Sequence, residues 1–316
     1  MLGGGLMATL GTTELRDGWA DLGDVRLHYV EAGEGPLVVL LHGFPEFWFG
    51  WRLQIPALVD AGFRVVAPDM RGYNLSSSPP GVAAYDTDRL AADVRDLIHE
   101  RGGQRALLAA HDWGAFVGWV TAMNHPEVVE RLAILNGLHP RRLLQGLRGP
   151  RQLAKSWYMF AFQIPWLPER LVRARGWWLL RSGFERDARP GAFPPQDMQR
   201  YVEAWSQPGF ATAAINYYRA GFRQTPRRAQ ARIRRVEAPT LVIWGERDRY
   251  LRSALAEPDR GDVPNLARVV RLPDASHWVQ HDEPERVSEL LVEFFAGAGP
   301  SSAHSAPVTS ASAKPS

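Results

Sequence analysis

Short apolar runs alternate with amphipathic stretches along the first part of the chain. The run at 37–41 is continuous and of strand length, which is typical of a parallel strand covered on both faces. The stretch at 86–100 instead has its apolar positions at helical spacing. This alternation predicts a doubly wound, mostly parallel sheet of the α/β class. The expected strands are 26–31, 37–41, 64–67, 105–110 and 132–135, and the expected helices are 86–100 and 115–124.

The alternation stops between about residues 139 and 236, in a segment rich in Trp, Arg and Pro. Strands return at 240–244 and 268–272, and a helix follows at 284–295. We therefore predict a helical cap, or lid, inserted into one sheet and placed over its carboxyl edge, where ligands of open α/β sheets bind. The helices expected in the cap are 152–163, 169–182, 196–205 and 210–224.

This pattern divides the chain into a core, a cap and a tail. We expect the core to comprise residues 1–138 and 237–298, and the cap to comprise residues 139–236. Residues 299–316 are rich in Ala, Ser and Pro, which predicts a disordered tail. The start is either Met1 or Met7, and the first residues do not resemble a signal peptide because no basic residue precedes them.

The composition excludes several kinds of site. The chain has no cysteine, so disulfides, thiolate metal sites and cysteine nucleophiles are excluded. No run approaches the roughly 18 to 20 apolar residues that a membrane span needs. Without a span or a targeting segment, we expect a cytoplasmic protein. The sequence leaves the oligomeric state open, and a homodimer is one of the alternatives.

The chain is basic, and the position of its arginines allows two interpretations. The formal net charge is +3 and the sequence pI is about 9.4, mostly because of arginine between Arg141 and Arg235. A basic surface can bind nucleic acid. However, no nucleic-acid motif accompanies these residues, so we interpret them as a solvated helix surface and expect no nucleic-acid partner.

Asp112 stands where an expected strand turns sharply into an expected helix. The sequence there is Ala110-His111-Asp112-Trp113-Gly114, with small residues two before and two after Asp112. Small residues let the chain double back, which is the pattern of a nucleophile elbow with Asp in the place of the usual Ser. Asp is also a good helix N-cap, and this alternative would explain the residue alone. The surrounding residues favour the catalytic interpretation.

A carboxylate nucleophile restricts the chemistry. Attack on an acyl carbon would give an anhydride, which leads to no useful product. Attack on a saturated carbon gives an ester that water can cleave. Asp112 therefore predicts substrates that are alkylating agents, either epoxides or alkyl halides.

An oxyanion hole is expected next to the elbow. The sequence His42-Gly43-Phe44-Pro45 follows the first buried strand. Gly43 lets the backbone turn tightly, so the amide of Phe44 can face the elbow together with the amide of Trp113. The alternative is an ordinary Gly-Pro turn. We expect His42 to be structural.

His277 is the histidine in the expected chain order of nucleophile, acid and base. It lies in a loop between an expected strand and the last helix, where the alternative is a surface histidine. His281 is four residues further on, and we expect it in the solvated start of that helix.

The acid that orients His277 is predicted after the strand at 240–244. Asp248 is favoured over Glu246, because it lies further from the strand end and can reach over the sheet edge. An acid after the strand at 132–135 would be a third alternative. That position holds Asn136, which is neutral and cannot take the role.

Tyrosines in the cap could protonate the alkoxide that epoxide opening releases. Tyr158 lies in one expected helix, and Tyr217 and Tyr218 lie in another. Two adjacent residues of a helix cannot both face one site. Tyrosines are also ordinary core residues, and helix spacing alone favours that interpretation over catalysis.

Taken together, the motifs resemble the α/β-hydrolase-fold epoxide hydrolases, over about residues 25 to 295. The resemblance implies an α/β-hydrolase fold with a cap and assigns ring opening to one tyrosine in each lid motif, here Tyr158 and Tyr218. The chain departs from the family at Asn74, where Gly is usual, and at Tyr217, where many relatives carry Trp. The matching stretches are 42–52, 69–76, 111–114, 156–158, 162–165, 216–219, 245–248 and 276–278.

The resemblance implies an epoxide hydrolase that needs no cofactor or metal. Asp112 would attack an apolar epoxide, a small-molecule substrate of unspecified size, to form an alkyl-enzyme ester, and His277 held by Asp248 would activate water to release a vicinal diol. Two alternatives stay open. One is a haloalkane or haloacid dehalogenase with the same nucleophile, and the other is a non-catalytic homologue that only binds a ligand.

Overall fold

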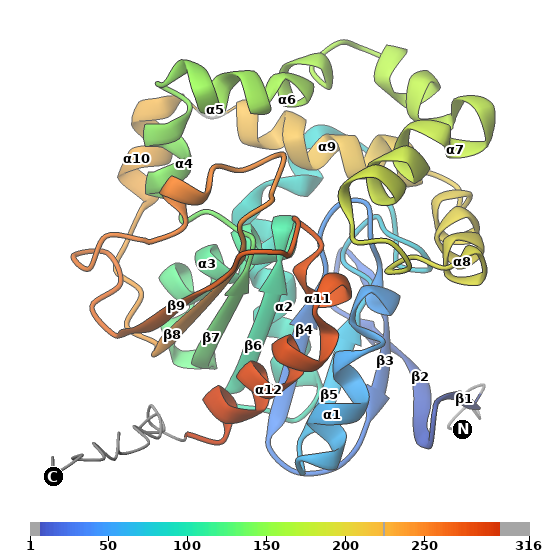
Figure 1. Ribbon diagram of the computed structural model, residues 1–316, viewed down its shortest axis with the longest axis vertical. Coiled ribbons are helices and arrows are strands. Elements are labelled where there is room, and N and C mark those ends of the chain that lie inside the picture. The colour runs from blue at the N-terminus through green and yellow to red at the C-terminus, as the bar shows by residue number, and fades with distance from the viewer. Residues whose placement is uncertain (1–6, 224, 298–316) are drawn as a thin grey trace, which may run out of the picture.

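A nine-stranded sheet runs through the part of the chain that this computed structural model describes, residues 7–223 and 225–297 (Figure 1). The strand order is β1-β2-β3-β5-β4-β6-β7-β8-β9, and the strands from β5 to β9 in this order are parallel. The mostly parallel sheet predicted from the sequence is confirmed. The predicted tail at 299–316 and Met1 lie outside the described residues. The strands are β1 (Met7–Leu10), β2 (Thr13–Asp21), β3 (Arg26–Ala32), β4 (Leu37–Leu41), β5 (Arg64–Pro68), β6 (Ala106–His111), β7 (Val129–Leu135), β8 (Thr240–Gly245) and β9 (Leu266–Leu272).

Helices cover both faces of the sheet. α2 and α3 pack together on one face, and α1, α11 and α12 lie on the other (Figure 1). These helices are α1 (Gln54–Asp60), α2 (Thr87–Glu100), α3 (Asp112–Asn124), α11 (Val279–Asp282) and α12 (Pro284–Phe295), with short 3-10 helices η1 (Trp48–Trp51), η2 (Val82–Tyr85), η3 (Pro126–Val128) and η4 (Ser253–Leu255).

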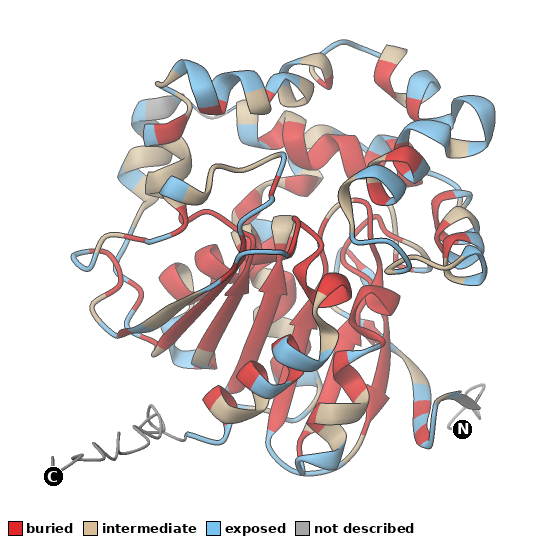
Figure 2. Cartoon of the chain, viewed as in Figure 1, coloured by how far each residue is buried: buried red, intermediate tan, exposed pale blue. Residues whose placement is uncertain are grey.

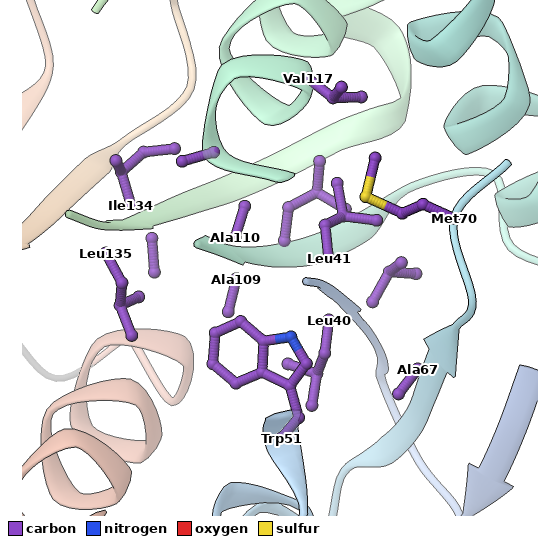
Figure 3. Packing of buried hydrophobic residues seen from close by; sticks show 14 of the residues in the cluster. Leu40, Leu41, Trp51, Ala67, Met70, Ala109, Ala110, Val117, Ile134 and Leu135 are labelled. Carbon is purple, nitrogen blue, oxygen red and sulfur yellow. The ribbon is translucent and has the colours of Figure 1, made fainter. Parts of the chain in front are cut away.

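The core is centred on strands β4, β6 and β7, whose apolar side chains are buried on both faces (Figure 2). Side chains of successive strand residues point to opposite faces. In Figure 3, Leu41, Ala110 and Ile134 face Val117 of α3, whereas their chain neighbours Leu40, Ala109 and Leu135 lie on the side of Trp51. Burial on both faces explains why these strands read as continuous apolar runs.

The helical insertion lies between β7 and β8 and covers the carboxyl ends of the parallel strands (Figure 1). The domain limits at 138/139 and 236/237 remain a prediction. No helix in the described residues is long and apolar enough to cross a membrane. The helices of the insertion are α4 (Pro140–Gly146), α5 (Pro150–Lys155), α6 (Trp157–Ala161), α7 (Leu167–Asp187), α8 (Pro195–Trp205), α9 (Phe210–Phe222) and α10 (Pro226–Arg232).

Several of these elements differ from those predicted. The helix expected at 152–163 is two short helices, because the backbone leaves helical geometry at Ser156. The helix expected at 169–182 is longer, and it is broken where Arg175, Gly176 and Trp177 adopt left-handed backbone. β1, β2, α4 and α10 were not predicted. β2 contains charged residues and a glycine, and α4 and α10 are short, Arg-rich and begin at proline, so none of them has a strong apolar period.

Candidate active site

The elbow at Asp112 has the geometry that its sequence predicts. β6 ends at His111, and α3 begins at Asp112, whose φ of 51° lies in the left-handed region. A side chain at Gly114 would collide with the carbonyls of His42 and Leu41. Only glycine therefore fits two residues after Asp112, because the helix passes so close to β4.

The loop after β4 brings an amide to the Asp112 carboxylate. The backbone N–H of Phe44 donates to Asp112 Oδ1 at 2.8 Å. A side chain at Gly43 would overlap the side chain of Asp112, so glycine is required here too. The amide of Trp113 belongs to the first turn of α3, whose N–H groups have no partner within the helix. The role of the Trp113 amide in an oxyanion hole remains a prediction.

His277 lies between two carboxylates. Its Nδ1 donates to Asp248 Oδ2 at 2.8 Å, and its Nε2 is 3.4 Å from Asp112 Oδ2. The residues come from loops after β6, β8 and β9, which end at one edge of the sheet. The structure thus brings together Asp112, Asp248 and His277 from three distant parts of the chain.

Asp248 is held by donors on both of its oxygens. The backbone N–H groups of Tyr250 and Leu251 donate to Oδ1, at 2.7 and 2.8 Å. The side-chain amide of Asn136 donates to Oδ2 at 2.8 Å. Asn136 is neutral and cannot act as an acid, but it fixes the carboxylate of Asp248, which does face His277.

Glu246, the competing acid, lies elsewhere. Its carboxylate is bound to Arg271 at 3.0 Å and to the hydroxyl of Ser253 at 3.1 Å, on the exposed side of the sheet edge. It therefore does not orient His277 in this structure.

The charges of these groups depend on one another. Burial alone would raise the pKa of Asp112, but His277, with smaller contributions from His111 and the Phe44 amide, outweighs burial and holds that pKa below its ordinary value. Burial would lower the pKa of His277, yet Asp248 and Asp112 outweigh it and raise the pKa to about 10. At neutral pH the free protein therefore holds an imidazolium between two carboxylates.

The two lid tyrosines singled out by resemblance lie over Asp112. Tyr158 on α6 and Tyr218 on α9 have ring centroids 5.8 Å apart, and both line one cavity with Asp112 and Trp113. Burial, and after it nearby groups that include the Asp112 carboxylate, raise the pKa of each tyrosine far above its ordinary value. Both hydroxyls therefore keep their protons at neutral pH and can donate.

Tyr217 faces the other way. It is fully buried, and its hydroxyl donates to the carbonyl of Arg71 at 2.7 Å. His42 also lies away from the chemistry: its Nε2 accepts from the amide of Met70, and its Nδ1 donates to the carbonyl of Gly43. Tyr217 and His42 are thus structural in their contacts.

A buried carboxylate that the sequence analysis missed lies behind the site. Glu46 Oε2 is 3.0 Å from Nδ1 of His111, and the hydroxyl of Tyr201 on α8 donates to Oε1 at 3.1 Å. His111 in turn donates from Nε2 to the carbonyl of His277 at 2.9 Å. Glu46 is thereby linked through one imidazole to the backbone of the histidine loop.

His281 belongs to the same buried cluster, so its expected place in a solvated helix start was wrong. It is 3% exposed, and its Nε2 donates to Glu46 Oε1 at 2.6 Å. Arg52 donates to its Nδ1 at 3.0 Å. Burial would raise the pKa of Glu46, but His281 and His111 outweigh burial and hold that pKa below its ordinary value. The buried charge of Glu46 is what draws His281 inward.

The cavity above Asp112 has a volume of about 340 Å³ and an apolar wall. Side chains of α3 form one side of it, from Trp113 through Phe116 and Val120 to Met123, and cap residues such as Leu143 form the other. Within the described residues, no group of three or more His, Cys, Asp or Glu side chains could hold a metal ion.

Comparison with known proteins gives matches over most of the chain. A family model described as the alpha/beta hydrolase fold matches residues 36–284. The AB hydrolase superfamily protein YfhM of Bacillus subtilis (strain 168) is 41% identical over 275 residues, which cover 86% of this chain and 94% of that protein. Epoxide hydrolase 4 of Homo sapiens is 38% identical over 279 residues, which cover 86% of this chain and 76% of that protein.

Solved structures give a similar result. The crystal structure of Bacillus megaterium epoxide hydrolase in complex with an inhibitor superposes with a TM-score of 0.81 at 32% sequence identity. The superposition covers 88% of this chain and all of that one. The likeness therefore includes the helical insertion as well as the sheet.

Proposed function

The chain belongs to the epoxide hydrolases of the α/β hydrolase fold, and we propose that it adds water to an apolar epoxide through an ester on Asp112 and releases a vicinal diol. The observation that carries the mechanism is the carboxylate of Asp112 at the elbow, with His277 on one side and two protonated tyrosines across the cavity. A carboxylate in this place can be alkylated by a strained ether, the epoxide, and can then be regenerated by water.

In the first step, Asp112 attacks an epoxide carbon. Its Oδ1 accepts the Phe44 amide, so Oδ2 is the oxygen left to form the new C–O bond. The epoxide C–O bond breaks on the far side of that carbon, and the departing oxygen receives hydrogen bonds from Tyr158 and Tyr218. Oδ1 then becomes the carbonyl oxygen of the ester, already bound in the oxyanion hole.

The first step also prepares the base for the second. Esterification removes the charge of Asp112, which is one cause of the raised pKa of His277. That pKa therefore falls when the ester forms, so the imidazolium releases a proton to solvent, while the alkoxide takes a proton from a tyrosine hydroxyl that solvent then replaces. The number of protons balances, and His277 becomes neutral when a base is needed.

In the second step, neutral His277 takes a proton from water. The hydroxide attacks Cγ of Asp112, and the amides of Phe44 and Trp113 stabilise the oxyanion that forms on Oδ1. The ester bond breaks, the released alkoxide takes the proton of the newly added hydroxyl, and the diol leaves. Asp112 is again a carboxylate and keeps one oxygen from water. Asp248 holds the imidazole in place and balances its charge.

The cavity suggests the substrate class. Its wall is apolar along α3 and on the cap side, and its volume of about 340 Å³ lies at the lower end of the range for small-molecule sites. We infer an apolar epoxide, such as an aryl or terpenoid one, as the substrate. We also propose a cytoplasmic location and retain a homodimer as a hypothesis for the assembly.

Incubation with styrene oxide and, separately, with a haloalkane tests the proposal. We expect phenylethanediol from styrene oxide, measured by chromatography, and no halide release. Halide release without diol formation would identify a dehalogenase instead. Binding of styrene oxide without any turnover would identify a non-catalytic ligand-binding homologue.

Replacing either tyrosine with phenylalanine is expected to slow ring opening. Tyr158→Phe and Tyr218→Phe each remove a donor to the departing oxygen, and general acids contribute roughly 10²- to 10⁴-fold, so we expect a loss of about 10² in kcat for each. The measurement is diol formation from styrene oxide. Tyr217→Phe is the matched control on the same helix, because its hydroxyl binds the carbonyl of Arg71. Equal losses in Tyr217→Phe and Tyr218→Phe would contradict the assignment.

A further inference from the structure

The outer edge of the cap exposes an unusual set of side chains. The segment from Trp157 to Arg181, which we call the outer cap segment, contains α6 and most of α7 and lies on the side of the cap away from the sheet (Figure 1). Much of it is solvent-exposed (Figure 2). Six large apolar side chains of this segment are between 46% and 66% exposed, namely Trp157, Phe160, Ile164, Trp166, Leu171 and Trp178.

The exposed charges of the outer cap segment all have one sign. They are Arg170, Arg173, Arg175 and Arg181. The segment contains a single acidic residue, Glu169, and its carboxylate is bound by Arg219 of α9. Among the described residues, no carboxylate forms an ion pair with Arg170, Arg173 or Arg175. Arg181 pairs with Glu185 at 3.6 Å, and Arg170 lies over the ring of Trp166. The segment therefore combines exposed tryptophans with three arginines that have no carboxylate partner in the part of the chain that the structure describes.

We propose that the outer cap segment binds the surface of an anionic lipid bilayer. Exposed apolar patches rimmed by polar groups mark interaction sites. Tryptophan side chains are enriched at the headgroup level of bilayers, and arginines beside them are attracted by anionic lipids. The partner chemistry that satisfies both features is a negatively charged surface with an apolar layer beneath it.

A second copy of the chain fits this segment less well. In a symmetric dimer the same patch meets itself, so the arginines of both copies would come together. The only carboxylate of the segment is already paired with Arg219. Like charges without counter-charges oppose such a contact, whereas an anionic bilayer supplies the missing charge.

The segment is also continuous with the wall of the cavity. Tyr158 and Met159 of α6 line the cavity, while Trp157 and Phe160 of the same helix are exposed. The ring of Phe160 packs against Phe222, another wall residue, with centroids 5.0 Å apart. An apolar molecule dissolved in the bilayer would therefore lie next to the wall of the cavity.

Sedimentation with vesicles tests the proposal on the full-length protein. We expect binding to vesicles of phosphatidylcholine with about 30% phosphatidylglycerol, little binding to pure phosphatidylcholine, and release in high salt, where charges are screened. A neutral pair, Arg173→Gln with Arg175→Gln, should lower the partition coefficient by about 25-fold, at about fivefold per arginine. Trp166→Ala with Trp178→Ala should lower it by tenfold or more.

The controls lie on the core. Trp19→Ala removes a tryptophan that is 40% exposed on β2, and Arg286→Gln removes an exposed arginine on α12, so both should bind vesicles like the wild type. Thermal unfolding establishes that each variant is folded. Equal binding to neutral and anionic vesicles, or no binding to either, would overturn the proposal. So would a dimer in solution that the cap tryptophan variant abolishes, because a second copy would then cover this face.

Discussion

Asp112→Ala is expected to abolish diol formation, with a loss on the order of 10⁴-fold or more in kcat. Removal of a covalent nucleophile leaves no other group in the site that can bond to the epoxide carbon. His277 keeps its imidazole and its partner Asp248 in this variant, but without the Asp112 carboxyl there is no ester for an activated water to cleave. The measurement is the initial rate with styrene oxide. Substantial diol formation by this variant would show that Asp112 is not the nucleophile.

An isotope experiment tests the same role in the unmodified protein. In a single turnover in H₂¹⁸O with enzyme in excess, the oxygen added to the substrate comes from the Asp112 carboxylate. The first diol should therefore be unlabelled, and the peptide that contains Asp112 should gain ¹⁸O. A labelled first diol with an unlabelled peptide would indicate direct attack of water and would contradict the ester mechanism.

The elbow could be predicted from the sequence because its constraints are local. Asp112 and Gly114 lie within three residues of each other, and the collision that demands glycine follows from the strand-turn-helix path itself. The strands on either side are continuous apolar runs, which are the clearest signal that a buried parallel strand leaves in a sequence. Local geometry and burial pattern thus led to the same residue.

The lid tyrosines could not be chosen in this way. Helix spacing shows that Tyr217 and Tyr218 face different directions, but not which direction is the site. The structure answers this through contacts that are far apart in the chain, since Tyr217 reaches Arg71 and Tyr218 packs on Phe44. Before the structure, only the family resemblance distinguished the two.

The cluster around Glu46 shows what the sequence cannot reveal. Its partners His111 and His281 are 65 and 235 residues away, and a histidine four residues after His277 gives no sign of being buried. The signal that was present is a carboxylate at Glu46 directly after the oxyanion turn, in a stretch that is otherwise apolar. A buried charge requires partners, so a carboxylate at this position is the one signal in the sequence that indicates a buried polar cluster here.

Asn136 is a related case. In the sequence, its position after the strand at 132–135 is a candidate place for the acid, and its neutral side chain excludes that role. In the structure, the Asn136 amide donates to Asp248, and a second carboxylate in this place would repel Asp248 instead. An amide there donates to Asp248 and also accepts from the amide of Gly245 at 2.8 Å. The residue therefore ties the acid loop to β7.

The second large effect is expected from His277→Gln, which should separate the two steps. The Phe44 amide and both tyrosines remain, so Asp112 can still attack the epoxide. Without a base, water attacks the ester slowly, and steady-state diol formation should fall by on the order of 10³-fold or more. The ester should then accumulate to one equivalent, visible by intact mass spectrometry as a mass increase equal to that of the epoxide.

Peptide mapping of that adduct locates the ester, and a matched control excludes unspecific alkylation. The added mass should lie on the peptide that contains Asp112, and a variant with both His277→Gln and Asp112→Ala should form no adduct. The loss of the imidazolium also leaves Asp248 as a buried carboxylate held only by Asn136 and two backbone amides, so thermal unfolding must show that the single variant is folded. If a folded His277→Gln protein consumed no epoxide and formed no ester, His277 would be required before the ester rather than after it. The order of events would then differ from the two steps proposed here, because the imidazolium would be needed to deliver its proton to the departing oxygen.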